Sequence, residues 1–584
     1  FHTGDVSTEG NLPTSFQNTP TLVDGTLYVC SPRNKVFALD PETGQEKWRF
    51  DAELVADGIY IMTCRGVSHW HEPNPTPGRA CQSRLFMGTL DARLFALDAE
   101  TGKPCTDFGK DGSIDLTEGV GGTYPGEYGV TSPPVIIGDR LVTGTLVLDN
   151  IRTDSPGGVV RAYDVRTGEK LWGWDPVPPG TEPTLDEDGN PTYARGTTNA
   201  WSILAADPEL GLVYVPTGNT SPDYYGGHRD GSDYYSSSIV ALDAATGEVR
   251  WHFQTVHHDI WDYDVPSQPA LFDWPGPQGP VKALAQATKL GHIFFLNRET
   301  GEPIWPVEER PVPQGALPGE TLSPTQPFPT RPAPIHPTRF TPDDAFGFSF
   351  LDRASCRRQI EAMRSEGLFT PPSTEGSIHF PGMVGGSNWG SLSIDPVRGI
   401  LIANSMRVAT WVQSIPREEY DRMEAAGELE PDWSYEPSFG TPYVVTRDFL
   451  ASMFGAPCNE PPWGVLTAID IATGEQRWEV PLGSTRDMAP WPLWLEIGVP
   501  NQGGSITTAS GLTFIAATTD DFIRAFSTET GEKLWQARLP AGGQATPMSY
   551  RLRPSSKQYV VIAAGGHGLL ETTPGDSVVA YALP

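Results

Sequence analysis

One short segment holds an unusual density of side chains able to do chemistry. Residues 255–266 read Thr-Val-His-His-Asp-Ile-Trp-Asp-Tyr-Asp-Val-Pro, which places three carboxylates, two histidines and two aromatic rings within ten residues. Carboxylates and imidazoles are the groups that most often move protons in catalysis. Packing a strand against its neighbours requires none of them, so we predict a functional site here. The alternative is a turn rich in aspartate, with tryptophan as packing.

A hydrolase metal site built from His257, His258 and Asp259 is another interpretation. Successive residues of a strand point to opposite faces, so the two histidines would not chelate one ion without distortion. The six cysteines form no C-x-x-C pair, so neither a zinc site nor a c-type haem is encoded. One or two disulfides are expected, first Cys64–Cys81 and then Cys356–Cys458, with Cys30 as a buried thiol.

The scaffold that positions these side chains is indicated by a phrase that recurs along the chain. Its first copy, residues 38–48, reads Ala-Leu-Asp-Pro-Glu-Thr-Gly-Gln-Glu-Lys-Trp, and every copy keeps the Thr-Gly pair. Glycine supplies the left-handed position of a tight turn, so each copy predicts a strand end, a turn and a second strand that opens on an aromatic ring. Copies begin at Ala38, Ala96, Ala162, Ala241, Phe295, Ala468 and Ala525, and six of the seven end in tryptophan.

Repeats of this length indicate units that bury their apolar faces against one another. A truncated copy begins at Val578, and residues 392–396 read as a degenerate copy inside the longest gap. We therefore predict an all-β fold: one eight-bladed β-propeller of four-stranded antiparallel blades over residues 1–584, whose C-terminal strand completes the blade begun at the N-terminus. A solenoid is the competing architecture, but it needs no closure and usually has a tighter period.

Two excursions are expected to interrupt the blades, at about residues 306–380 and 413–463. The first opens with a proline-rich stretch that cannot be helical, and it shows helical character at 352–366. The second contains a short charged helix near 417–426. Long loops on a rigid ring are where lids and substrate walls usually lie.

The net charge of −31 argues against nucleic acid or an anionic membrane surface as a partner. No stretch reaches the ~18 to 20 apolar residues that a membrane-spanning helix needs. We recognise no signal-peptide pattern at the start of the sequence, and we expect Phe1 to lie within a strand. We therefore expect a processed or truncated protein whose targeting region, and any membrane anchor, lies outside this sequence.

Several longer phrases occur in order along the whole chain: residues 64–67 (Cys-Arg-Gly-Val), 257–262 (His-His-Asp-Ile-Trp-Asp), 369–372 (Phe-Thr-Pro-Pro), 539–548 (Leu-Pro-Ala-Gly-Gly-Gln-Ala-Thr-Pro-Met) and 563–568 (Ala-Ala-Gly-Gly-His-Gly). With them the chain resembles the quinoprotein dehydrogenases, an eight-bladed family that uses pyrroloquinoline quinone (PQQ). Within that family it is most similar to the membrane-bound glucose dehydrogenases and their polyol and quinate relatives.

The resemblance implies a set of catalytic and cofactor-binding residues. Asp262 matches the family's base, which takes the hydroxyl proton while the carbon gives hydride to the quinone's C5. Lys289 matches the cation that contacts the quinone oxygens, where other branches use arginine, and Trp201 matches the indole on which the cofactor stacks. Arg65 matches the arginine that pairs with cofactor carboxylates. Further implied contacts come from the hydroxyls of Thr131 and Ser132 and from the amide of Asn404.

The resemblance also implies a divalent ion that acts as a Lewis acid on the quinone carbonyl. Asp149 corresponds to the family's metal-binding carboxylate, with Asn150 as a rival, and Asn219 corresponds to its amide. Asp262 is a further candidate ligand. An all-oxygen ligand set suits Ca²⁺ or Mg²⁺ rather than a transition metal.

The substrate is less narrowly implied. His71 lies where the glucose branch places a histidine near the substrate, with His69 as a rival because of a one-residue insertion. Residues 491–504 replace a methionine- and proline-rich stretch and bring in Trp491 and Trp494, which favours a substrate larger or more apolar than glucose. Quinate, polyols and bulkier secondary alcohols all remain tenable. No fused haem domain is recognised, so a separate acceptor is expected, either membrane quinone or cytochrome c.

The sequence as a whole predicts a periplasmic dehydrogenase, dependent on PQQ and on Ca²⁺ or Mg²⁺, that oxidises a small alcohol, polyol or sugar. The alternative is a non-catalytic propeller that serves as a scaffold or assembly protein. Such a protein would need the Thr-Gly and tryptophan pattern, but not the five site residues together: Asp262, Lys289, Trp201, Asp149 and Arg65.

Overall fold

The computed structural model describes residues 1–6, 14–186, 188–431 and 433–583, and its regular structure is almost entirely antiparallel sheet. Sheets of three or four strands follow one another along the chain, and within each the strands lie side by side in sequence order. The first four comprise β2 (Thr21–Val23), β3 (Thr26–Cys30), β4 (Lys35–Leu39) and β5 (Glu46–Asp51); β7 (Ser68–His71), β8 (Ser83–Gly88), β9 (Arg93–Asp98) and β10 (Ser113–Asp115); β12 (Val135–Ile137), β13 (Arg140–Thr143), β15 (Val160–Asp164) and β16 (Lys170–Trp174); and β19 (Ala205–Asp207), β20 (Leu212–Pro216), β21 (Ser238–Asp243) and β22 (Val249–Gln254).

The series continues through the second half of the chain. Its sheets comprise β23 (Ala270–Gly276), β24 (Gly279–Ala287) and β25 (Ile293–Asn297); β29 (Leu392–Asp395), β30 (Ile400–Met406), β34 (Gly464–Asp470) and β35 (Gln476–Pro481); β36 (Ser505–Thr507), β37 (Leu512–Ile515), β38 (Phe522–Ser527) and β39 (Lys533–Arg538); and β40 (Met548–Arg551), β41 (Gln558–Ala564) and β42 (Ser577–Ala582).

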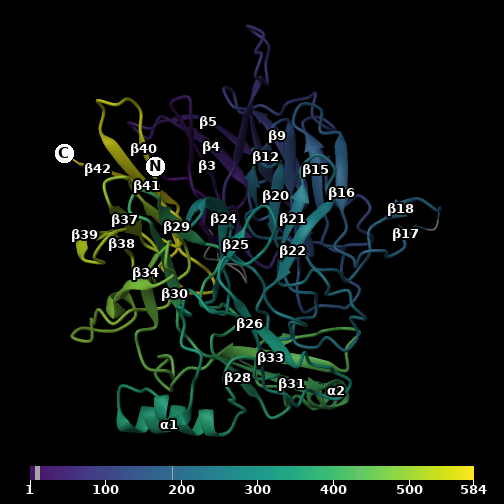
Figure 1. Ribbon diagram of the computed structural model, residues 1–584, viewed down its shortest axis with the longest axis vertical. Helices are drawn as coiled ribbons and strands as arrows, with labels where there is room; N and C mark the ends of the chain where they lie inside the picture. The colour runs from purple at the N-terminus through teal and green to yellow at the C-terminus, as the bar shows by residue number, and fades with distance from the viewer. Residues whose placement is uncertain (7–13, 187, 432, 584) are drawn as a thin grey trace.

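Further elements lie outside this series. A separate sheet is formed by β28 (Ser377–His379), β31 (Thr410–Pro416), β33 (Tyr443–Phe449) and β32 (Tyr435–Glu436). Figure 1 shows this sheet with α1 (Phe350–Glu361) and α2 (Arg417–Ala426) at the lower end of the view. The short pairs are β1 (Thr14–Ser15) with β6 (Met62–Thr63), β11 (Tyr128–Gly129) with β14 (Leu146–Val147), β17 (Thr184–Leu185) with β18 (Pro191–Thr192), and β26 (Val307–Pro311) with β27 (Thr325–Pro329); 3₁₀ turns cover Pro342–Asp344 and Thr485–Asp487.

The repeated sheets pack side by side, and the two ends of the chain meet. The first strand of one sheet lies against the first strand of the next, as β12 does against β7 and β19. Apolar residues of the first and last sheets, such as Phe37 and Val561, share one core cluster. The Thr3 amide donates to the Asp576 carbonyl at 2.9 Å, so the N-terminal residues extend the last sheet beside β42, as the sequence predicts. This places both ends of the chain in one sheet, which removes a free edge.

The repeated Thr-Gly phrase joins neighbouring sheets. The Trp251 indole lies where a Cβ on Gly301, the glycine of the following copy, would stand 2.6 Å from the ring, and Trp251 Nε1 donates to the Arg298 carbonyl at 3.3 Å. Trp48 and Trp172 contact the next copy's glycine in the same way. The turn glycine therefore supplies both a left-handed backbone, with φ of 78° at Gly301, and the space for the ring.

We expect Gly301→Ala to lower the unfolding free energy by about 3 kcal/mol, because it combines left-handed strain with a clash against Trp251. Gly44→Ala is the matched control: it has a φ of 71° but nothing within 4 Å of an added Cβ, so it should cost about 1 kcal/mol. Urea denaturation of the two variants checks the difference. Equal losses would mean that the ring contact contributes nothing.

The disulfide predictions were partly wrong. Cys356–Cys458 is confirmed and ties α1 to the loop after β33, but the other pairs are Cys30–Cys64 and Cys81–Cys105. Cys30 is therefore not a thiol, and Cys64–Cys81 does not form. The reason is packing between neighbouring sheets, which brings Cys30 and Cys64 into one buried cluster. Spacing alone cannot choose among the pairings of six cysteines.

Two local predictions are confirmed and one is wrong. Both helices of the excursions exist, the second with the predicted bounds. Residues 392–396 are not a copy of the repeated phrase, because β29 is the first strand of the sheet whose third strand, β34, leads into the copy at Ala468. No helix in the described part of the chain is long and apolar enough to cross a bilayer.

Candidate functional site

The segment singled out by sequence forms a tight turn around Asp262. Asp262 has a left-handed backbone, with φ of 61°. The buried Asp259 carboxylate accepts hydrogen bonds from the amides of Trp261 and Tyr263, both at 2.9 Å, and from the Ser237 hydroxyl at 2.7 Å. Asp259 therefore holds the backbone on both sides of Asp262 and leaves the Asp262 side chain free to project from the turn.

The aromatic neighbours of Asp262 anchor this turn to the first excursion. Trp261 Nε1 donates to the Thr370 carbonyl at 2.9 Å, and the Tyr263 hydroxyl donates to the Pro381 carbonyl at 2.7 Å. The Phe369 ring makes edge-on contacts with both rings. The Phe-Thr-Pro-Pro phrase thus forms part of the wall that holds the turn in place.

A lysine and a tryptophan from other sheets reach the same turn. Lys289, two residues beyond β24, places Nζ 2.6 Å from Asp262 Oδ1 and 2.8 Å from Asp264 Oδ1. Trp201 Nε1 donates to Asp264 Oδ2 at 2.7 Å. Asp264 therefore links Lys289 to Trp201, and three residues predicted from sequence lie together.

Buried carboxylates gather around Asp262. Burial, together with the nearby charges of Asp262 and Asp264, raises the pKa of Asp149 to about 8. Burial and the same kind of repulsion raise the pKa of Asp223 well above its usual range. Burial raises the pKa of Asp262 to about 6, although Lys289 lowers it. So many buried acids in mutual repulsion favour the binding of a cation.

The two amides proposed near this cluster have partners of their own. Asn150 Nδ2 donates to Asp223 Oδ2 at 2.6 Å, and Asn150 Oδ1 accepts from the Asp223 amide at 2.8 Å, so Asn150 orients Asp223. Asn219 Nδ2 donates to the Asp259 carbonyl at 3.1 Å, while its Oδ1 accepts from the Thr220 amide at 2.7 Å. Both side chains thus brace the carboxylate cluster.

Arg65 is a buried cation that has no carboxylate partner among the described residues. Its Nη1 donates to the hydroxyls of Thr131 at 2.6 Å and Ser132 at 3.2 Å, while its Nε has no partner within the described ranges. The guanidinium lies 5.1 Å from the Trp201 ring centroid and 5.4 Å from that of Trp389. Burial without a counter-charge lowers the pKa of Arg65 to about 9. Such a group favours the binding of an anion.

Two pockets adjoin these residues. Thr131, Ser132 and Trp201 line one of them. Asn404 lines the other with the loop that follows β28, and its Nδ2 donates to Asn501 Oδ1 at 2.7 Å and to the Gly503 carbonyl at 3.2 Å.

The comparisons with known proteins decide the family. Residues 1–560 match the family model described as "PQQ: Glucose/ethanol/alcohol dehydrogenase, beta-propeller domain". The chain belongs to this family of PQQ-dependent dehydrogenases.

Curated relatives of this dehydrogenase carry several substrate names. It is 42% identical to quinoprotein glucose dehydrogenase of Escherichia coli, covering 100% of this chain and 74% of the relative. It is also 42% identical to the glycerol dehydrogenase large subunit of Gluconobacter oxydans, covering 100% of this chain and 81% of that protein. The quinate/shikimate dehydrogenase of Acinetobacter baylyi is 39% identical, with 100% of this chain and 74% of the relative covered. Among solved structures, the quinohemoprotein alcohol dehydrogenase of Comamonas testosteroni matches 97% of this chain and 74% of its own, with a TM-score of 0.68 and 25% identity.

The proposed substrate histidine has no contact with the carboxylate cluster among the residues described. His71 is exposed at the end of β7, and its Nδ1 lies 2.8 Å from the Glu72 carbonyl. Its rival His69 lies 2.7 Å from the Ser83 hydroxyl. Trp494 contacts Ala489 and Arg486 within its own segment rather than a site residue.

The histidines of the central segment bind different partners. His257 lies 3.0 Å from Glu309, whereas His258 lies 2.7 Å from Asp233 and 2.8 Å from Glu320. They therefore do not share an ion, contrary to the hydrolase interpretation. His258 instead ties the turn around Asp262 to the proline-rich excursion that carries Glu320.

We expect the His258 contacts to stabilise this dehydrogenase in a pH-dependent way. Bonds to Asp233 and Glu320 outweigh burial and raise the pKa of His258 from 6.5 to about 9. The stabilisation, about 3 kcal/mol, is then complete below pH 6.5 and is lost as the pH rises through 9. The difference in unfolding free energy between the native protein and His258→Gln should therefore shrink between pH 6 and pH 10. His257→Gln, at a more exposed neighbour, is the control, and a difference independent of pH would refute this role.

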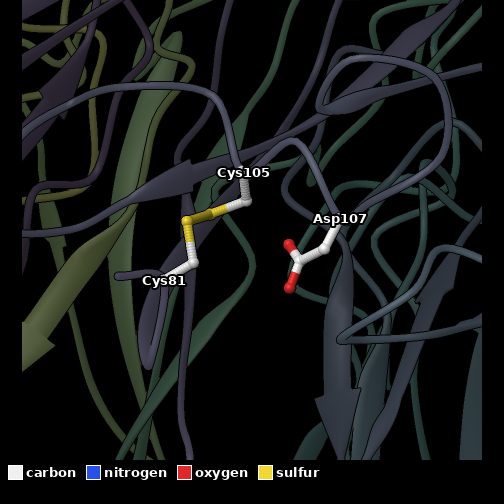
Figure 2. A group of neighbouring side chains, drawn as sticks. All are labelled: Cys81, Cys105 and Asp107. Atoms are coloured by element: carbon white, nitrogen blue, oxygen red, sulfur yellow. A yellow bond between two sulfur atoms is a disulfide. The ribbon is translucent and has the colours of Figure 1, made fainter. Parts of the chain in front are cut away.

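Another group of potential metal ligands has a structural explanation. Figure 2 shows Cys81, Cys105 and Asp107 close together, but the two cysteines form a disulfide and so offer no thiolate. Asp107 forms an ion pair with Arg84 at 2.7 Å. This group is a crosslink beside a salt bridge.

Sequence reasoning missed several residues of the site. Asp264 could have been found, because it stands two residues after Asp262 in the same acidic segment. Asp223, Trp389 and Arg447 come from separate loops and strands, and no local pattern marks them as members of the site.

Proposed function

We propose that this dehydrogenase oxidises an alcohol, polyol or sugar hydroxyl by hydride transfer to bound PQQ, with Asp262 as the general base and a Ca²⁺ or Mg²⁺ ion beside it. The observation that carries the proposal is that one site contains buried charged groups of both signs without ion-pair partners in the described structure. Among the described residues, the buried Arg65 guanidinium has no carboxylate partner. The buried carboxylates of Asp149 and Asp223 have no ion-pair partner in the same part of the chain, because Lys289 and Arg447 pair with Asp262 and Asp264 instead.

The residues present fit the cofactor. Arg65 would pair with a carboxylate of PQQ, helped by the hydroxyls of Thr131 and Ser132, because its Nε has no partner among the described residues. The Trp201 indole, fixed by its bond to Asp264, would form the face on which the planar ring system stacks. Asn404 would contact the ring system from the second pocket.

The residues present also fit a hard divalent cation. Asp149 and Asp262 would be ligands, and we add Asp223, whose buried Oδ1 has no partner in the part of the chain that the structure describes. Asn219 stays in the proposed ligand set at its edge, since its amide oxygen already accepts hydrogen bonds. Carboxylate and amide oxygens suit Ca²⁺ or Mg²⁺.

The chemistry follows from what each side chain can do. When bound, PQQ supplies the acceptor for the hydride, and the ion supplies positive charge beside its carbonyl. Asp262 takes the hydroxyl proton, and its pKa of about 6 leaves it mostly ionised at neutral pH, as a base must be. Lys289 orients Asp262 through Oδ1 and leaves Oδ2 to face the substrate.

The proposal also covers the domain organisation, the cellular location and the electron acceptor. We propose a single domain of eight blades over residues 1–584, with excursions at about 306–380 and 413–463. A periplasmic location is supported by three disulfides, which persist in oxidising compartments. A separate acceptor, membrane quinone or cytochrome c, would take the electrons. His71 stays a proposed substrate contact with no supporting contact among the described residues.

The test is dye-linked oxidation by the apoprotein, with and without PQQ and with Ca²⁺ or Mg²⁺, over glucose, quinate, glycerol and bulkier secondary alcohols. Activity that requires both additions supports the proposal. Failure of the protein to bind PQQ would favour the alternative of a non-catalytic propeller scaffold.

A further inference from the structure

The sheet formed by β28, β31, β33 and β32 brings two charged side chains to Asp262. Most of this sheet is inserted between β30 and β34. Glu436 on β32 lies opposite Val445, two residues before Arg447 on β33. Because residues two apart in a strand share a face, Glu436 and Arg447 are diagonal neighbours on one face of the sheet.

Arg447 lies between two carboxylates at the open side of the site. Its Nη1 is 3.4 Å from Asp262 Oδ2, 3.0 Å from the Tyr224 hydroxyl and 2.8 Å from Met383 Sδ, and its Nη2 is 3.4 Å from Glu436 Oε1. Its side chain is 17% exposed, against 15% for Asp262 and 21% for Glu436. The three groups form a row of acceptor, donor and acceptor that solvent reaches.

The position of the reacting hydroxyl makes Arg447 a neighbour of the substrate. A hydroxyl that gives its proton to Asp262 must lie within hydrogen-bond reach of the carboxylate. Lys289 holds Oδ1 at 2.6 Å, whereas Oδ2 has the longer 3.4 Å contact with Arg447, so Oδ2 is the oxygen that a substrate hydroxyl can reach. A substrate on Oδ2 therefore has Arg447 beside it, and 3.4 Å is too long for a strong direct bond between Arg447 and Asp262.

We propose that Arg447 donates to the oxygen on the carbon next to the one being oxidised, so that the site selects vicinal diols over simple alcohols. This rests on the function proposed above. Oxygens on adjacent carbons are spaced so that one can bind Asp262 Oδ2 while the other accepts from Arg447 Nη1. Glu436 orients the guanidinium and accepts from a further hydroxyl of a longer polyol.

The charges favour a neutral hydroxyl over a carboxylate as the second group. Arg447 is flanked by Asp262 and Glu436, and Asp149 and Asp223 lie in the same electrostatic neighbourhood. A carboxylate on the substrate would meet these like charges, whereas a hydroxyl accepts from Arg447 and donates to Glu436. The arrangement therefore fits polyols and sugars better than the apolar substrate suggested by Trp491 and Trp494.

The test uses holoenzyme reconstituted with PQQ and Ca²⁺ and compares kcat/KM for 1,2-propanediol, 1,3-propanediol and 1-propanol. We expect the native enzyme to favour the 1,2-diol over both others. Arg447→Met should lower the ratio of 1,2-propanediol to 1-propanol about 10- to 100-fold, the effect of losing one charged hydrogen bond. Arg447→Lys should restore part of the ratio.

The ratio of the two kcat/KM values distinguishes substrate recognition by Arg447 from a structural role, because a displaced Asp262 would slow the oxidation of both substrates alike. A native enzyme with no preference for the 1,2-diol would overturn the proposal, as would an unchanged ratio in Arg447→Met. If the PQQ-loaded enzyme oxidised none of the three alcohols, the result would count against the proposed function itself.

Discussion

Asp262→Asn is expected to lower kcat about 10²- to 10⁴-fold, the usual contribution of a positioned general base. The amide keeps the shape of the side chain but cannot take a proton at the Oδ2 position, which is the atom left free by Lys289. The left-handed turn should survive, because its hydrogen bonds come from Asp259 rather than from Asp262. Steady-state rates of the reconstituted enzyme, together with circular dichroism of the variant, check both parts.

A matched control for this variant is Asp175→Asn. Burial also raises the pKa of Asp175 to about 6, but its carboxylate accepts from the Ala194 amide, and no described contact joins it to Asp262 or Lys289. It should therefore leave kcat within about threefold of native, since substitutions outside the reacting groups rarely affect chemistry. If Asp262→Asn kept more than a tenth of the native kcat, Asp262 would not be the base.

Arg65→Met is expected to weaken PQQ binding about 10²- to 10³-fold while leaving the apoprotein as stable as before, or more stable. The reason is that Arg65 is buried and has no carboxylate partner in the described structure, so the apoprotein carries the cost of desolvation without an ion pair to offset it. Binding of an anionic ligand would offset this desolvation cost. Equilibrium dialysis with PQQ and thermal unfolding of the apoprotein measure the two quantities separately.

Arg65→Lys is the control that separates the effect of the positive charge from the effect of the guanidinium geometry. Lysine keeps the positive charge but lacks the guanidinium fork, so PQQ affinity should fall between those of the native protein and Arg65→Met. If Arg65→Met lowered the stability of the apoprotein but left PQQ affinity unchanged, Arg65 would serve the fold and not cofactor binding.

The order of the sheets could be predicted from the sequence because it depends on interactions between residues close together in the chain. Each Thr-Gly turn joins two adjacent strands, and its tryptophan docks on the next copy's glycine, as Trp251 does on Gly301. Repetition of that local unit predicts antiparallel sheets packed side by side. The helix at Arg417–Ala426 is likewise a local feature, and its predicted bounds match the structure.

Long-range pairings could not be read in this way. Cys30 and Cys64 meet because neighbouring sheets pack together, and nothing near either cysteine records that contact. The same holds for Asp223, which reaches the carboxylate cluster with Asn150 as its hydrogen-bond partner. Arg447 arrives from an inserted sheet, so only the three-dimensional arrangement places it beside Asp262.

Of the residues implied by the resemblance to quinoprotein dehydrogenases, the structure brings several together and leaves His71 apart from them. Asp262, Lys289 and Trp201 lie together through Asp264, because the turn held by Asp259 leaves them little freedom. His71 lies at the end of β7 with its side chain exposed, and it contacts none of these three residues in the described part of the chain.

The central claim is tested most directly by anaerobic mixing of the PQQ- and Ca²⁺-loaded protein with 1,2-propanediol, with the absorbance of the bound cofactor as the readout. The account predicts reduction of the cofactor in a single turnover, with one carbonyl product formed for each PQQ reduced. It also predicts that deuterium on the oxidised carbon slows the change, since the C–H bond breaks in that step. If the bound cofactor's spectrum did not change, with this diol or with glucose, glycerol and quinate, hydride transfer from an alcohol at this site would be contradicted.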